Sequence, residues 1–169
     1  MTKFDRPFWK TQSLAQMTRA EWESLCDGCG RCCVEKFENR KTGKVYFTNV
    51  ACRFLDMQSC RCSAYHRRKK EAPWCLILTA KLVPKIGWLP QTCAYRLVFE
   101  KKELYRWHPL LSGSSETVHE AGISVRGKVI SSQYVHPDDL DNYIVDLKVW
   151  GRLGSDLKDK IPDKRNGAK

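Results

Sequence analysis

The sequence has no long apolar run and no recognisable leader. Its longest apolar stretch, Cys75 to Val83, is interrupted by Thr79 and Lys81 and falls far short of the ~18 apolar residues that a membrane-spanning helix needs. The first nine residues mix charged and aromatic side chains, without the apolar core or the small-residue cleavage site of a secretory signal. We therefore expect a cytoplasmic protein that does not insert into a membrane.

The common motifs of nucleotide and hydrolase sites are also missing. There is no P-loop or nucleophile elbow, and Gly28-x-Gly30 continues to Cys33 instead of the third glycine of a dinucleotide-binding loop. None of the four histidines is paired at ligand spacing, and His119-Glu120 lacks the second histidine of a zinc-protease helix. The catalytic residues, if there are any, stay unassigned.

Cysteine and positive charge, by contrast, are abundant. The 169 residues include nine cysteines, and 30 Lys and Arg against 19 Asp and Glu give a net charge of +11. Both excesses concentrate in residues 26–75, which hold eight of the cysteines and eleven basic against five acidic side chains. Because a cytosol keeps thiols reduced, such a cluster is typical of metal binding or thiol chemistry rather than of structural disulfides.

The cysteines follow the spacing of thiolate metal ligands. Two-residue spacers let neighbouring sulfurs reach one ion at about 2.3 Å for zinc, and three cysteines at this spacing also resemble the run that holds an iron–sulfur cluster in ferredoxins. The residues leave open the choice between zinc and an iron–sulfur cluster, and also whether one of the adjacent Cys32 and Cys33 serves a second site. The predicted metal ligands are Cys26, Cys29, Cys32, Cys33, Cys52, Cys60, Cys62 and Cys75. Cys93 is expected to be a buried core thiol.

The basic charge has two explanations. The clearest run, residues 67–70, lies between Cys62 and Cys75, where it can balance thiolates and lower the pKa of thiols as readily as it can bind phosphate. No recognised nucleic-acid module is present, and the basic residues are not interleaved with aromatic side chains that would stack on bases. Binding to RNA or DNA is therefore the weaker alternative.

Short elements are expected around the cysteines. Thr18-Arg-Ala-Glu21 is a capping box that opens a helix leading to Cys26, and the glycines at 28 and 30 predict a tight loop over residues 26–33. Turn residues at 39–43 before a strand at 45–48 predict a hairpin. A second turn near 58–59 would place Cys60 and Cys62 on one face of an extended chain.

The rest of the chain is expected to build a more conventional core. Pro73 predicts a helix over 74–82, with Cys75 near the N-terminus where a thiolate is favoured. Further helices are expected at 90–99 and 114–121, a strand at 123–130, and a helix that begins at Pro137. That last helix has an apolar stripe at Leu140, Tyr143, Ile144 and Leu147.

Taken together, the motifs resemble those of the YcgN-like bacterial cysteine-cluster proteins, within the wider YkgJ group of zinc- or iron-chelating domains. The resemblance is carried by Cys26-Asp-Gly-Cys-Gly-Arg-Cys-Cys33, Cys52-Arg-Phe-Leu55, Cys62-Ser-Ala-Tyr-His-Arg-Arg68, Pro73-Trp-Cys75, Leu89-Pro-Gln-Thr-Cys-Ala-Tyr-Arg96, Trp107-His-Pro-Leu110 and Val118-His-Glu-Ala-Gly-Ile-Ser-Val-Arg126. One departure is that the wider group has Arg-Pro soon after the tyrosine, whereas here the proline comes at position 73. The resemblance implies metal or iron–sulfur binding in a bacterial cytoplasm, and no reaction.

These observations predict one small α+β domain over residues 1–155, with a cysteine-cluster segment at 26–93 and a loose charged tail at 156–169. The expected function is metal binding, of zinc or an iron–sulfur cluster, in an unknown process. Two alternatives stay open. One is a cluster-dependent modifying enzyme of the transferase type, with His108 or His119 at its site, although a structural role is favoured for His108. The other is a zinc-stabilised basic adaptor for RNA or another acidic partner.

Overall fold

Short helices and strands alternate with long connections in the computed structural model, which describes residues 6–146. The fold is α+β, as the sequence predicts. The strands are β1 (Val34–Glu38), β2 (Val45–Ala51), β3 (Ile130–Ser131) and β4 (Ile144–Val145). The α-helices are α1 (Phe8–Thr11), α2 (Arg19–Ser24), α3 (Arg68–Glu71), α4 (Ala94–Phe99), α5 (Pro109–Ser112) and α6 (Thr117–Glu120). Turns of 3-10 helix are η1 (Leu14–Gln16), η2 (Arg31–Cys33), η3 (Tyr65–Arg67), η4 (Val83–Lys85), η5 (Ser132–Tyr134) and η6 (Pro137–Tyr143).

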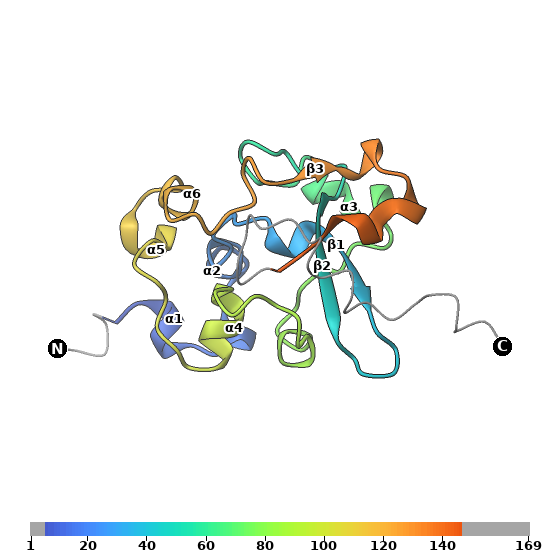
Figure 1. Cartoon of the computed structure of the whole chain (residues 1–169). Coiled ribbons are helices and arrows are strands. Elements are labelled where there is room, and N and C mark those ends of the chain that lie inside the picture. Colours follow the sequence, from blue (N-terminus) through green and yellow to red (C-terminus); the bar gives the residue numbers. More distant parts are fainter. Residues whose placement is uncertain (1–5, 147–169) are drawn as a thin grey trace.

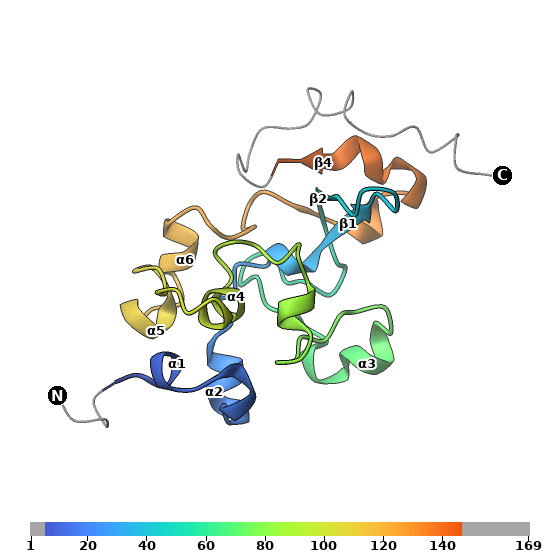
Figure 2. The same cartoon turned by 90° about the horizontal axis from the view of Figure 1, so that it is seen from below.

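Strand β2 is the centre of a mixed four-stranded sheet. It pairs antiparallel with β1 and β4 and parallel with β3, and Figure 2 shows β4 beside the β1–β2 hairpin. The turn of that hairpin forms as predicted, because Asn39 accepts hydrogen bonds from the backbone of Lys41 and Thr42 and Gly43 takes a positive φ. Figure 1 shows α1, α2, α4, α5 and α6 on one side of the molecule and the sheet on the other.

Two apolar clusters form the core, one on each side. The helical cluster is built around Leu25 and Leu89 with residues of α4, and the smaller sheet cluster contains Val34, Ala51 and Val125. Leu25 is fully buried in the first cluster and Val34 is 3% exposed in the second. The eight residues between them are the predicted cysteine loop, so this loop joins the two clusters.

The helix predicted over residues 74–82, with Cys75 at its N-terminus, does not form. The segment consists of turns and irregular chain. In a helix Trp74 and Leu78 would share a face, yet Trp74 is 66% exposed while Leu78 packs against the helical cluster. Packing of individual side chains therefore decides the path of this segment, and Cys75 lies in a turn.

The predictions for the last third of the chain need correction too. The strand expected at 123–130 shrinks to β3, because Gly127 turns the chain with a φ of 70° and the Val125 N–H is bonded to the cysteine loop. The final helix is the 3-10 helix η6, and Ile144 leaves it to pair with Thr48. Leu147 and the predicted tail lie outside the described residues.

The helices predicted at 90–99 and 114–121 form over shorter ranges, as α4 and α6. Gly122 ends α6 with a φ of 69°. None of the helices in residues 6–146 has the length and apolar character that crossing a membrane requires.

Candidate metal centre

The cysteine loop, residues 26–33 and called the knuckle below, starts directly after α2. The predicted capping box holds that helix: Thr18 accepts a hydrogen bond from the Glu21 N–H, and the Glu21 carboxylate accepts one from the Thr18 N–H. Leu25 then fixes the end of the helix in the core. The first cysteine therefore has a rigid support.

Two glycines let the knuckle turn tightly against its neighbours. Gly28 and Gly30 have φ angles of 77° and 72°, in the left-handed region that glycine adopts without strain. A Cβ atom at Gly30 would lie 2.7 Å from Cγ2 of Val125, and one at Gly28 would lie 2.9 Å from Cζ of Arg61. The backbone conformation favours glycine at both positions, and close packing against Val125 adds to this at Gly30, whereas the Arg61 side chain beside Gly28 can move aside.

Hydrogen bonds to distant residues hold the knuckle and Leu25, the residue just before it. His108 Nε2 donates to the Leu25 carbonyl at 3.1 Å, and the Val125 N–H donates to the Cys29 carbonyl at 2.8 Å. Arg31 turns back and donates from Nε to the Ile123 carbonyl at 2.6 Å. Residues more than 80 positions away thus fix the shape of the loop.

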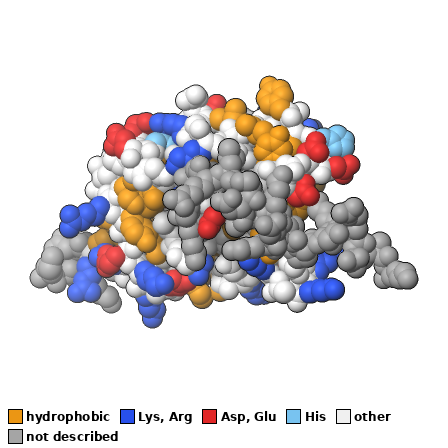
Figure 3. All heavy atoms as spheres, in the orientation of Figure 1, with side chains coloured by type: hydrophobic (Ala, Val, Ile, Leu, Met, Phe, Trp, Pro, Cys, Tyr) orange, Lys and Arg blue, Asp and Glu red, His pale blue; other side chains and the backbone are white. Residues whose placement is uncertain are grey.

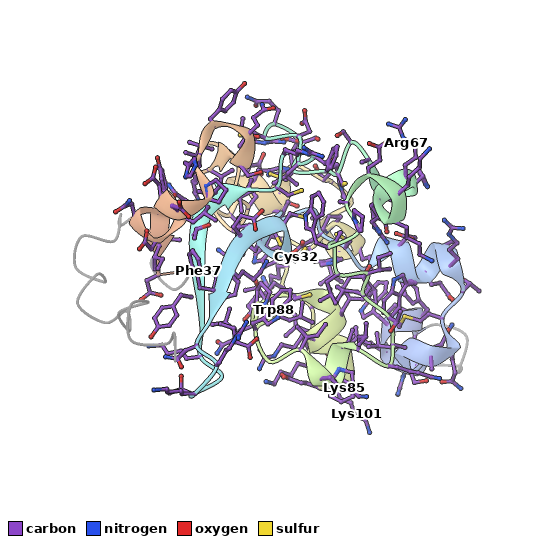
Figure 4. All side chains as sticks on the ribbon, turned by 90° about the vertical axis from the view of Figure 1, so that its right-hand side faces the viewer. Cys32, Phe37, Arg67, Lys85, Trp88 and Lys101 are labelled. Atoms are coloured by element: carbon purple, nitrogen blue, oxygen red, sulfur yellow. The ribbon has the colours of Figure 1, made fainter. Side chains whose placement is uncertain are left out.

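The second half of the knuckle is held by nearer residues. Lys36 Nζ donates to the Cys32 carbonyl at 2.8 Å, and its ammonium lies 4.5 Å from the centre of the Trp88 ring. The Cys52 N–H donates to the Cys33 carbonyl, also at 2.8 Å. In Figure 4 Cys32 lies near the middle of the view, beside the β1–β2 hairpin. The hairpin thus brings a further cysteine next to the loop.

The thiols of the knuckle lie close enough to affect each other's protonation. Burial and then the charges of Cys32 and Asp27 raise the pKa of Cys26 to about 11. The same causes, with Asp27 ahead of Cys32, raise the pKa of Cys29 well above its ordinary value. Cys33, whose sulfur is 3.9 Å from that of Cys32, lowers the pKa of Cys32, and Lys36 lowers it further. A cation would relieve this mutual repulsion.

A second group of thiols, Cys52, Cys62 and Cys75, comes from three separate segments. Burial raises the pKa of Cys75, and the charges of Cys52, Cys62 and Cys32 raise it further. The sequence predicted that Cys75 lies at a helix N-terminus, which would lower its pKa and favour the thiolate. Because that helix does not form, burial instead raises the pKa. Arg68 is the one basic residue of the 67–70 run that lowers it. Through Cys32 this second group adjoins the knuckle.

The remaining two cysteines pack into the two apolar clusters. Cys60 packs in the sheet cluster, is 4% exposed and has a φ of 54°, so the chain is not extended there and the prediction that Cys60 and Cys62 share a face fails. Burial raises its pKa, and no other thiol is among the causes. Cys93 is half-buried against the helical cluster, and burial, together with the charges of Cys32 and Asp27 in the knuckle, raises its pKa to about 12.

The nine cysteines are all free thiols. Within residues 6–146, no three Cys, His, Asp or Glu side chains are arranged so that they could hold a metal ion as they stand. Metal binding therefore requires the thiols to turn toward a common point, as in sites that form together with their ion. The chemistry of the donors fits zinc or an iron–sulfur cluster, both of which bind thiolates.

His108 has a structural role, as predicted. It is 1% exposed, and while Nε2 donates to the Leu25 carbonyl just before the knuckle, Nδ1 accepts a hydrogen bond from the Leu110 N–H. Burial lowers its pKa, so the imidazole is neutral. His119 is bonded to Ser124 Oγ through Nδ1 at 2.7 Å.

Sequence reasoning did not anticipate that His108, Ile123 and Val125 would support the knuckle. A signal was nevertheless present, because all three lie in or beside the motifs at 107–110 and 118–126 on which the family resemblance rests. Asp27 was likewise not singled out, although it lies between the first two cysteines.

On the face that Figure 3 shows, the basic side chains do not collect into one patch. Figure 3 shows Lys and Arg dispersed over one face, with Asp and Glu among them. Arg67 points outward from the start of α3 in Figure 4 and lies 3.8 Å from the Glu71 carboxylate. Arg68 lies over the Tyr65 ring, 3.9 Å from its centre. Much of the local charge is thus engaged within the protein.

Comparison with known proteins points to the same cysteine-rich segment. The family model "CxxCxxCC: Putative zinc- or iron-chelating domain" matches residues 25–94. A UPF0260 protein of Rhizobium leguminosarum bv. trifolii (strain WSM2304) is 57% identical over 156 residues, which cover 92% of this chain and 96% of that protein. The chain belongs to the UPF0260 family.

Other UPF0260 proteins are similarly close. One from Agrobacterium fabrum is 57% identical over 146 residues, covering 86% of this chain and 90% of that protein. One from Brucella melitensis biotype 2 is 56% identical over 140 residues, covering 83% and 91%. No solved structure matches the chain significantly. The likeness to UPF0260 proteins extends beyond the CxxCxxCC segment into the part that contains His108 and Val125.

Proposed function

We propose that this protein binds metal, as zinc or an iron–sulfur cluster, through a thiolate centre made by the knuckle and the second thiol group. The proposed ligands are Cys26, Cys29, Cys32, Cys33, Cys52, Cys62 and Cys75. Cys60, the eighth residue that the sequence pattern suggests, is left out because it packs into the sheet cluster. Bound zinc would cross-link these segments, and a cluster would add electron transfer.

The observation that carries the proposal is the position of the knuckle. It joins two apolar clusters, and hydrogen bonds from distant segments hold it in a fixed shape. Free thiols gathered on such a support repel one another once they ionise, and a cation removes that cost. If these thiols served only to fill an apolar core, there would be no reason for the exposed Cys32 to lie beside several other thiols.

The basic residues of the segment support the same function. Lys36 and Arg68 favour ionised thiols at Cys32 and Cys75 respectively. Because thiolates carry negative charge, neighbouring cations reduce the cost of deprotonating the ligands. This accounts for part of the positive charge without a nucleic-acid partner.

The compartment and the branch of the family are also proposals. Nine free cysteines are typical of a reducing cytoplasm, and the named relatives come from Rhizobium, Agrobacterium and Brucella. We place the chain in the YcgN-like branch of bacterial proteins because its motifs at 89–96, 107–110 and 118–126 resemble that branch.

The test is anaerobic purification of the full untagged chain, followed by an absorption spectrum and analysis for iron, zinc and acid-labile sulfide. Iron with matching sulfide identifies a cluster, and zinc in a colourless sample identifies a zinc centre. Cys29→Ser should lose metal and melt at a lower temperature, because ligand binding and folding are coupled. Cys93→Ser is the control and should keep its metal. An unchanged metal content and melting temperature in Cys29→Ser would refute the proposal.

A further inference from the structure

The knuckle contains a buried carboxylate that has one oxygen without a partner. Asp27 is 5% exposed, and its Oδ1 accepts a hydrogen bond from the Cys29 N–H at 2.9 Å. Its Oδ2 is buried and receives no hydrogen bond. A buried carboxylate oxygen that is left unsatisfied is costly, so a group absent from the protein itself is expected to contact Oδ2.

The surroundings of Asp27 show what kind of group that is. The Asp27 carboxylate lies near enough to the thiols of Cys26, Cys29 and Cys32 for its charge to act on each of them. The three thiols are also close enough for the charge of one to affect the protonation of another, in every pair. Four acidic groups thus lie close together within one eight-residue loop. A cation bound among them would offset their mutual repulsion once they ionise.

The backbone fixes the carboxylate in this position. Gly28 follows Asp27 with a φ of 77°, and the hydrogen bond from the Cys29 N–H orients Oδ1. The other oxygen therefore cannot turn out to solvent unless that bond breaks. Arg31 is the basic residue of the loop itself, and its charge acts on both Asp27 and Cys29 while its Nε donates to the Ile123 carbonyl, but Asp27 Oδ2 receives no hydrogen bond from it.

We propose that Asp27 Oδ2 is the fourth ligand of the metal held by Cys26, Cys29 and Cys32, which gives a shell of three sulfurs and one oxygen. This inference rests on the proposed function, because it specifies a ligand of the same centre. Carboxylate oxygen binds zinc at about 2.0–2.2 Å, shorter than the 2.3 Å of a thiolate. Asp27 then fills the fourth coordination position of the metal, which the sequence pattern would assign to Cys33. A carboxylate is a harder donor than the thiolate that it replaces.

X-ray absorption on the full-length protein loaded with Zn²⁺ alone tests the assignment. The wild type should show one light-atom neighbour near 2.0–2.2 Å besides sulfur, and Asp27→Ala should lose that neighbour. Asp27→Asn keeps the acceptor for the Cys29 N–H but removes the charge, and should weaken zinc binding by about 10–100-fold in a chelator competition.

Asp56→Asn is the matched control. The Asp56 carboxylate also accepts a hydrogen bond from a backbone N–H two residues ahead, that of Gln58, but the residue is exposed. Its substitution should leave the zinc affinity unchanged. Because Asp27→Ala removes a turn contact, Asp27→Asn keeps the test decisive should the alanine variant fail to fold.

Two results would overturn the inference. An all-sulfur zinc shell in the wild type, with one sulfur lost in Cys33→Ser, would assign the fourth position to Cys33 and leave the proposed function intact. Equal zinc affinity of Asp27→Asn and the wild type would also refute it. If the wild type bound no metal at all, the proposed function itself would fail.

Discussion

Replacing His108 by phenylalanine tests how strongly the buried imidazole supports the knuckle. The substitution keeps an aromatic ring but removes the hydrogen bond to the Leu25 carbonyl and the one from the Leu110 N–H. Each such bond contributes about 1 kcal/mol, and the buried carbonyl left unpaired costs about 1–3 kcal/mol. We expect a loss of about 3–5 kcal/mol in the free energy of unfolding. The melting temperature should fall by about 6–20 °C.

The same variant should change how stability depends on pH. Burial lowers the pKa of His108 in the folded protein below its ordinary 6.5, so below pH 6.5 the unfolded chain binds a proton that the folded protein does not. Stability therefore rises with pH up to about 6.5 and is lost as the pH falls, by at most about 1.4 kcal/mol per pH unit for this group. His108→Phe should remove that part of the slope.

Urea unfolding at several values between pH 5 and pH 7.5 measures both effects. Metal release at low pH also destabilises the protein, so the slope of His108→Phe must be compared with that of a variant that keeps His108. The exposed His66 offers such a control, because His66→Gln leaves the buried imidazole in place. Equal slopes for the wild type and His108→Phe would refute the reasoning, since the folded protein would then protonate His108.

Two further substitutions test the packing of the knuckle. Gly30→Ala should lower the stability of the folded protein more than Gly113→Ala does. Both glycines have a φ above 70°, which costs an L-residue about 1–2 kcal/mol. Only at Gly30 does the new Cβ also come within 2.7 Å of Val125. Equal melting temperatures of the two variants would show that the loop is loosely packed. Cys60→Ala should lower the melting temperature but keep the bound metal, whereas Cys62→Ala should lose metal. Elemental analysis of the two purified variants measures this difference. Loss of metal in Cys60→Ala would show that Cys60 is a ligand after all.

The sequence was sufficient where local rules decide the structure. The capping box at Thr18, the glycine-rich knuckle and the Asn39 turn each depend on neighbouring residues, and each formed as predicted. Their side chains and backbone angles carry the information within a few positions.

The sequence was insufficient where contacts between distant residues determine the structure. The segment after Pro73 has helix-forming residues, but its side chains divide between core and solvent and no helix forms. The stripe that begins at Leu140 leaves its helix at Ile144 because β2 offers a strand to pair with. In the candidate site, the cysteine spacing predicted the knuckle, but the support from His108 and Val125 depends on the fold as a whole.

The support of the knuckle by His108 and Val125 sets an order of events during biosynthesis. The segment that matches the CxxCxxCC model ends at residue 94, before either residue has been made. A nascent chain that stops there has its cysteines but not the hydrogen bonds that hold the Leu25 and Cys29 carbonyls. The knuckle therefore gains these two hydrogen bonds only after residues 108 and 125 have been made, and the segment after residue 94 is needed to give it its final shape.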